Sequence, residues 1–132
     1  MKKFVALGIL AVAGVVGTWG TWGLLQAQQP NDTGAFMQIK LQHAQKIVEG
    51  LALENYDLIG KSAQKLALMS HESNWNVLQT VEYNRLSREF RDSTDRLHKA
   101  ASEKNLDGAT LAYFEVTLNC VRCHKYERLS EK

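Results

Sequence analysis

The sequence predicts an all-α protein that folds as an antiparallel, up-down-up-down four-helix bundle. Four segments carry apolar side chains at steps of three and four residues, the spacing that places them along one face of a helix. The only proline of the chain, Pro30, lies before the first of these segments. Short polar connectors separate the segments, and four amphipathic helices joined in this way pack most simply as such a bundle.

The first 27 residues read as a targeting segment. Two lysines follow the initial methionine, and the stretch from Phe4 to Leu25 carries no charge, as in a secretory signal peptide. This stretch of 22 residues is also long enough to span a bilayer, so residues 1–27 are either a cleaved signal peptide or an uncleaved N-terminal anchor. Residues 28–33 form a polar, flexible linker to the folded domain.

The folded domain is expected to cover residues 34–132. Its first helix is predicted over residues 34–50, with an inward seam typical of a bundle helix. That seam consists of Met37, Leu41, Ala44, Val48 and Leu51. The second helix is predicted over residues 54–70. Its inward side chains are Ile59, Ala63, Leu66 and Met69.

The second half of the domain supplies the other two helices. The third is predicted over residues 75–103, where a charge-rich run from Arg85 to Arg96 forms its solvated face. Its inward side chains are Leu86, Phe90, Leu97 and Ala101. The fourth is predicted over residues 107–128. Its inward side chains are Leu111, Phe114, Leu118 and Val121.

The most specific motif of the chain lies in the predicted fourth helix. Residues 120–124 read Cys-Val-Arg-Cys-His, the attachment signature of c-type haem. Cys120, Cys123 and His124 stand at i, i+3 and i+4, so they share one helix face. Two thiols can then attach to the two vinyl groups of one porphyrin, and the histidine can bind the iron as its proximal ligand. The sequence therefore predicts one haem c, covalently bound in the core of the bundle.

Two other interpretations of the cysteine pair stay open. An exported Cys-x-x-Cys pair can oxidise to a structural disulfide, and histidines elsewhere in the chain could complete a zinc site. Both cysteines of the chain lie in this motif, so no second pair is present to complete a four-cysteine zinc site. Covalent haem attachment takes place outside the cytoplasm in bacteria, which agrees with the predicted leader and indicates a periplasmic protein, anchored to the inner membrane if the leader is retained.

Net charge excludes nucleic acid as an expected partner. The chain has 16 basic and 14 acidic side chains, and two of the lysines belong to the predicted leader, so the folded domain is formally neutral. No pair of carboxylates or Ser-His-Asp group converges by spacing, so we do not expect an enzyme.

A family resemblance follows from these features. A four-helix chain whose Cys-x-x-Cys-His lies near the C-terminus resembles the class II c-type cytochromes, the group of cytochrome c prime and its low-spin relatives. The similarity is best around Phe90-Arg91, over residues 97–101 and 105–107, and from Cys120 to Arg128. It implies that Arg128, four residues after His124, lies near the haem propionates. The family's aromatic residue stands three positions after the histidine, whereas Tyr126 stands two after it.

The resemblance also bears on the sixth ligand of the iron. In low-spin members a methionine early in the first helix fills this position, and Met37 is the residue at that place. If Met37 is instead a core residue, Lys40 or Leu41 one turn later would cover the iron, and His43 is a further candidate ligand. His71 and His98 are expected to be solvated surface residues.

Two functions remain, and the sixth ligand separates them. A methionine ligand suits electron transfer with redox partners that dock transiently, whereas an apolar cover leaves the iron free to bind nitric oxide or carbon monoxide. The resemblance further implies a possible homodimer through the first two helices. Aromatic side chains that could serve such a surface are Tyr56, Trp75 and Tyr83.

Overall fold

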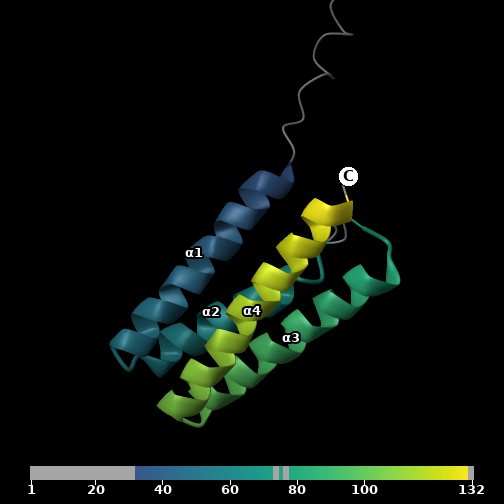
Figure 1. Ribbon diagram of the computed structural model, residues 1–132. Coiled ribbons are helices and arrows are strands. Elements are labelled where there is room, and N and C mark those ends of the chain that lie inside the picture. Colours follow the sequence, from purple (N-terminus) through teal and green to yellow (C-terminus); the bar gives the residue numbers. More distant parts are fainter. Residues whose placement is uncertain (1–31, 73–74, 76–77, 131–132) are drawn as a thin grey trace, which may run out of the picture. The chain divides into compact units, whose positions relative to one another are not determined.

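The computed structural model describes residues 32–72, 75 and 78–130. The described residues form four helices and no strand: α1 (Asp32–Ala52), α2 (Tyr56–Met69), α3 (Val81–Ser102) and α4 (Leu106–Ser130) (Figure 1). This confirms the all-α, four-helix prediction. The predicted leader and most of the predicted linker lie outside the described residues, and α1 begins at Asp32, two residues before its expected start. Along the described part of the chain, no helix is both long enough and apolar enough to cross a membrane.

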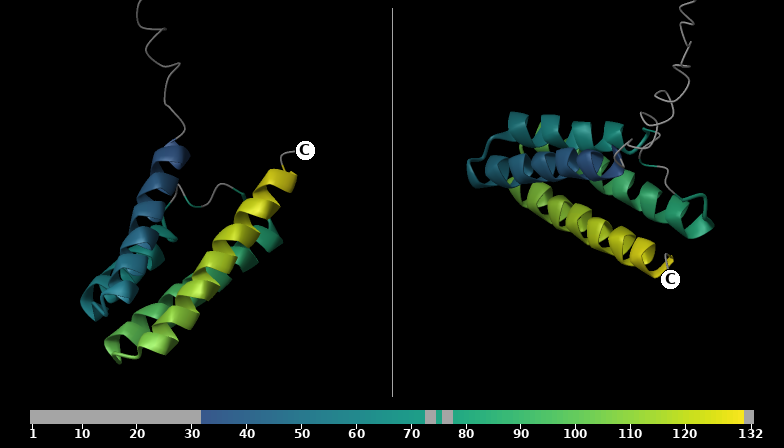
Figure 2. Two further views of the ribbon diagram at one scale, coloured as in Figure 1. Left: turned by 60° about the vertical axis from the view of Figure 1, so that its left-hand side comes forward. Right: turned by 90° about the horizontal axis from the view of Figure 1, so that it is seen from above.

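Successive helices run in opposite directions, as an up-down-up-down bundle requires. Extensive contacts join α1 to α2, α2 to α3 and α3 to α4, whereas α1 touches α4 sparsely. The ribbons of α1 and α4 diverge towards the end of the bundle that carries Asp32 and Ser130 (Figure 2). The seam between the first and the last helix is therefore the least tightly closed of the bundle's four sides.

Two of the interhelical connections share one local design. Glu54 and Lys104 adopt positive φ angles of 52° and 54°, and each is followed by an asparagine that caps the next helix. The side-chain oxygen of Asn55 accepts a hydrogen bond from the backbone N–H three residues later at 3.0 Å, and Asn105 does the same at 2.8 Å. Asparagine is among the best residues for this role because its short carbonyl reaches the free N–H groups of the first turn.

The third helix begins later than predicted. Its start was expected at Trp75, but α3 begins at Val81, where the hydroxyl of Thr80 accepts a hydrogen bond from the backbone N–H of Tyr83 at 3.1 Å. Trp75 lies before the helix and is buried, with its ring centroid 4.9 Å from that of Phe90. The predicted third helix therefore began too early, because Trp75 belongs to a separate segment that packs against α3.

The inward faces of α2 and α3 are confirmed. All eight side chains predicted to face inward on these two helices are buried. They are Ile59, Ala63, Leu66 and Met69 on α2, and Leu86, Phe90, Leu97 and Ala101 on α3. The predicted exterior run on α3 is largely exposed, and Arg85 pairs there with both Glu82 and Glu89.

The predicted inward face of α4 is wrong, and that of α1 is right only in part, because Met37, Ala44 and Leu51 are half-buried. On α4 the large apolar side chains are exposed, Leu111 by 68 % and Phe114 by 62 %, and small residues occupy the core instead. The buried residues of α4 are Ala109, Ala112, Val116 and Asn119. Small side chains let helices approach closely, so this stripe packs against the rest of the bundle. On α1, Leu41 and Val48 are half-exposed, and the buried residues are Phe36, Lys40, Ile47 and Gly50.

Candidate functional site

Two adjoining cavities open beside the seam between α1 and α4. Both are lined by Met37, Lys40, Phe90, Cys120 and His124. The larger has a volume of about 140 Å³, and Leu41, Ala44, Leu66 and Val116 complete its lining. The smaller lies towards the end of α4 and also includes Trp75, Tyr83, Asn119, Cys123 and Glu127. The structure thus brings four of the five predicted site residues to one place.

The motif residues lie on one face of α4, as their spacing predicts. Cys120 and Cys123 are half-buried and free, and burial raises the pKa of both thiols, while the nearby Lys40 acts in the opposite direction. The side chain of His124 is 46 % exposed, and its Nδ1 lies 4.0 Å from a carboxylate oxygen of Glu127. Two thiols and an imidazole therefore border the same cavity wall.

The disulfide and zinc interpretations of the cysteine pair stay predictions. The cysteines form no disulfide in the structure. Across the residues that the structure describes, no three His, Cys, Asp or Glu side chains gather as a metal-binding group, and a structural zinc site needs four such ligands. A haem iron takes only one or two ligands from the protein, so His124 with one residue of α1 would suffice.

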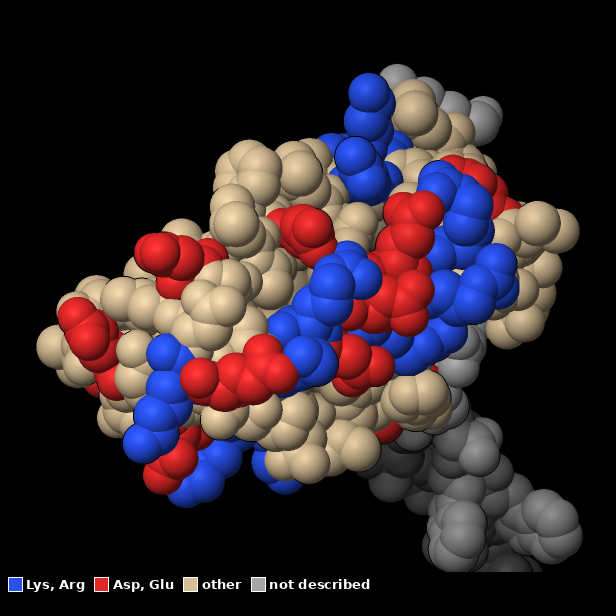
Figure 3. Space-filling model, turned by 90° about the horizontal axis from the view of Figure 1, so that it is seen from below, with Lys and Arg blue, Asp and Glu red and all other residues tan. Residues whose placement is uncertain are grey.

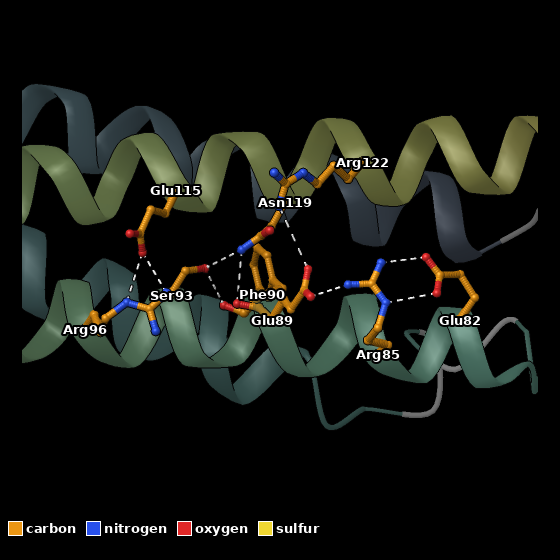
Figure 4. Close-up of polar contacts among 9 residues, drawn as sticks. All are labelled: Glu82, Arg85, Glu89, Phe90, Ser93, Arg96, Glu115, Asn119 and Arg122. Atoms are coloured by element: carbon orange, nitrogen blue, oxygen red, sulfur yellow. Dashed lines mark hydrogen bonds and ion pairs between the residues drawn. The ribbon is translucent and has the colours of Figure 1, made fainter.

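Polar contacts with α3 fix the position of the turn of α4 that carries Cys120 and His124. Asn119, the residue before Cys120, is buried and donates through Nδ2 to the backbone carbonyl of Glu89 at 3.0 Å and to the hydroxyl of Ser93 at 3.1 Å (Figure 4). One helical turn earlier, an ion pair of 2.6 Å joins Glu115 to α3 (Figure 4). These bonds set the rotation of α4 and thereby aim both thiols at the cavity. Asn119 was not singled out from the sequence, although it continues the small-residue stripe of Ala109, Ala112 and Val116.

The residues of α1 that face the cavity agree in part with the prediction. Met37 is half-buried against the core and lines both cavities, and Leu41 lines the larger one. His43 lines neither of these two cavities. Burial lowers the pKa of His43, and Lys46 and Lys65 act in the same direction. The geometry therefore favours Met37 over His43 as a candidate ligand.

Lys40 is the unexpected member of the site. Its side chain is only 9 % exposed, and its Nζ lies 3.7 Å from the centroid of the Trp75 ring and 5.0 Å from that of Phe90. Burial lowers its pKa from 10.5 to about 8, although Cys120, Cys123 and Glu127 each act to raise it. From the sequence, Lys40 was named only as a residue that could cover the iron. Its burial was not predicted, because a lysine is seldom found in a core.

The aromatic residues around Lys40 are held firmly. Trp75 donates from Nε1 to the hydroxyl of Ser87 at 2.9 Å, and the hydroxyl of Tyr83 donates to the backbone carbonyl of Trp75. Trp75 and Tyr83 are 3 % and 2 % exposed, so neither of these two aromatic residues can form the exposed dimer surface considered above. Tyr56 is half-buried.

The two remaining residues named by the resemblance lie away from these cavities. Arg128 is exposed near the end of α4 and lines neither cavity. The hydroxyl of Tyr126 shares a hydrogen bond of 2.8 Å with that of Thr80, which joins the last turns of α4 to the start of α3. Of the two expected surface histidines, His71 is exposed, and His98 is exposed with its Nδ1 3.1 Å from the carbonyl of Gly60.

The donor set fits a haem of the c type. The cavity walls combine two free thiols, an imidazole, a thioether and apolar side chains, which are the groups that attach, ligate and cover such a cofactor. A porphyrin is larger than the cavity, so its insertion would widen the seam between α1 and α4, where these helices touch least. The residues present thus match the group, and the open side of the bundle is where it would enter.

Among the described residues on the face shown in Figure 3, no extended patch of one charge is seen. Acidic and basic side chains interleave in a band across the face shown in Figure 3. Ion pairs such as Arg96–Glu115 and Lys99–Glu103 account for part of this pattern.

Comparisons of the chain with protein-family models, with curated proteins and with solved structures find no match. The likeness to class II cytochromes therefore depends on the motif and on the layout of the helices.

Proposed function

We propose that the chain is an exported, mono-haem c-type cytochrome of the class II kind that transfers electrons. The observation that carries this proposal is the smaller cavity, which Cys120, Cys123 and His124 border from α4 and Met37 borders from α1. A covalently attached haem supplies an iron that cycles between two oxidation states.

Each residue has a definite task in this proposal. Cys120 and Cys123 tether the macrocycle to α4, and Asn119 holds that part of α4 against α3 so that the tether is rigid. His124 would hold the iron, and Glu127, whose carboxylate lies 4.0 Å from Nδ1 of His124, would orient the ring and make it a better donor. Met37 would supply a thioether ligand, which favours the reduced iron and raises the reduction potential.

The alternative is a five-coordinate haem protein that binds nitric oxide or carbon monoxide. Leu41, one turn after Met37, also lines the larger cavity and would cover the iron with an apolar surface. In this case Met37 would be a wall residue rather than a ligand.

Expression together with a cytochrome maturation system tests the proposal. The purified protein should be coloured, and its mass should exceed that of the polypeptide by one haem. Its reduced absorption spectrum should show sharp low-spin bands that carbon monoxide does not change. A colourless protein with the bare polypeptide mass would refute the proposal.

Two methionine variants then assign the sixth ligand. Met37→Ala should convert the spectrum to the high-spin form and make it sensitive to carbon monoxide. Met69→Leu is the matched control, because Met69 is buried in the core and lines neither cavity. A wild-type spectrum that already responds to carbon monoxide would favour the gas-binding alternative.

Location and partners follow from the same proposal. Haem attachment outside the cytoplasm requires export, which residues 1–27 would direct, either as a cleaved signal or as an inner-membrane anchor. The partners would be redox proteins that dock transiently, and the interleaved charges on the face shown in Figure 3 offer them no large area of one sign there.

A further inference from the structure

Lys40 carries a buried charge that the described part of the chain leaves without an ion-pair partner. Among the described residues it is the only Lys, Arg, Asp or Glu that is buried, and none of the described carboxylates lies within 4.0 Å of its Nζ. Its contacts are the faces of the Trp75 and Phe90 rings. Aromatic faces attract a cation, but they return only part of the hydration energy that an ammonium loses on burial.

A buried ammonium is normally paired with an anion. The groups that face Lys40 across the smaller cavity are Cys120, Cys123, His124 and Glu127 from α4, and Tyr83 from α3. The thiols would be consumed by haem attachment, and His124 would hold the iron. Glu127 raises the pKa of Lys40 only from beyond ion-pair distance. The cavity therefore presents a cation without supplying its counter-ion.

We propose that Lys40 is the cation that pairs with a carboxylate of the group bound in this cavity, namely a propionate of the haem. This inference rests on the function proposed above and assigns a role that the family resemblance implies for Arg128. Lys40 is buried and borders both cavities, whereas Arg128 is exposed and borders neither. An ion pair gains more from a buried position than from an exposed one, because water screens it less.

The test uses the haem-loaded protein and four variants. Lys40→Met removes the charge and keeps the length of the side chain, whereas Lys40→Arg keeps the charge. Lys46→Met removes an exposed lysine of the same helix and serves as the matched control. Arg128→Met tests the residue that the family resemblance implies. Reduction potential is measured from pH 5 to 7.5, and the melting temperature is measured at pH 7.

We expect the wild-type potential to vary little over this range, because a propionate paired with a cation stays ionised. In Lys40→Met the propionate should take up a proton more readily, so that the potential falls as the pH rises, and the melting temperature should drop. Lys40→Arg and Lys46→Met should resemble the wild type. Glu127→Gln added to Lys40→Met removes the other carboxylate near Lys40, and the pH dependence should persist in this double variant.

Several results would overturn the inference. A haem-loaded Lys40→Met protein with the wild-type potential and melting temperature shows that no pair exists, and an effect confined to Arg128→Met assigns the propionate to that residue. A change in spin state in Lys40→Met would instead make Lys40 an iron ligand. A wild-type melting temperature that rises with acetate, but not with chloride of equal ionic strength, would assign the counter-ion to a diffusible carboxylate. Failure of the proposed function is recognised separately, since the wild-type protein would then carry no haem.

Discussion

Replacing Lys40 by methionine should stabilise the haem-free chain. Burial lowers the pKa of Lys40 from 10.5 to about 8, which corresponds to about 3 kcal/mol of unfavourable free energy when the group is charged in the folded state. Methionine fills a similar volume without a charge, but it forgoes a cation–π attraction of about 0.5–2 kcal/mol with the ring of Trp75. The net expectation is a gain of about 1–3 kcal/mol in the free energy of unfolding at pH 7.

The pH dependence gives this prediction a second signature. Below pH 8 the lysine is charged in both the folded and the unfolded chain, so the full destabilisation is present. Between pH 8 and 10.5 the unfolded chain binds more protons than the folded one, so the stability of the wild type rises with pH. Above pH 10.5 the group is neutral in both states. The difference between Lys40→Met and the wild type should therefore be largest below pH 8 and shrink up to pH 10.5.

Urea unfolding of reduced, haem-free protein, followed by circular dichroism at pH 7, 8.5 and 10, measures the effect. Lys46→Met on the exposed face of α1 is the control and should change the stability by less than about 0.5 kcal/mol. The reasoning is refuted if Lys40→Met is less stable than the wild type at pH 7, or if the difference between the two does not change with pH.

Three further substitutions test the packing around the site, each by urea unfolding. Asn119→Ala should lower the free energy of unfolding by about 1–3 kcal/mol, because it removes two buried hydrogen bonds; a change like that of an exposed residue would contradict this. Gly50→Ala should also destabilise despite the better helix propensity of alanine, since its Cβ would lie 2.7 Å from a side-chain carbon of buried Ile59; a gain in stability would show that Ile59 yields. Arg96→Ala should cost at most about 1 kcal/mol, because its pair with Glu115 is exposed; a larger loss would reveal further coupling between α3 and α4.

The sequence predicted α2 and α3 well because each has one apolar stripe opposite a clearly polar face. The charge-rich run of α3 leaves no second face that could be buried. On α4 two stripes compete, one of large side chains that includes Leu111 and Phe114, and one of small side chains that includes Ala109 and Ala112. The large apolar side chains led to the prediction that the first stripe faces inward. In the structure the second stripe is buried, because small side chains allow the helices to pack closely. A hydrophobic period alone does not separate these alternatives.

The candidate site was predictable to the extent that it is local. Cys120, Cys123 and His124 follow from five consecutive residues, and their common face follows from helix geometry. The approach of Met37 to them depends on how α1 and α4 are paired, which the sequence supported only through a family resemblance. Lys40 and Trp75 come together from different segments, so no spacing along the chain could predict their contact.

If the proposed haem is bound, the haem-free and haem-loaded forms of the protein place opposite demands on the charge of Lys40. In the haem-free chain the charge of Lys40 weakens the seam between α1 and α4, at the side of the bundle where these helices touch least. If a propionate then pairs with Lys40, the same charge stabilises the haem-loaded protein. Lys40 would then destabilise the haem-free fold and stabilise the haem-loaded one. Lys40→Met should accordingly raise the melting temperature of the haem-free chain and lower that of the haem-loaded protein. A shift of the same sign in both forms would show that Lys40 responds to burial alone, because only a bound anion reverses the effect of removing a cation.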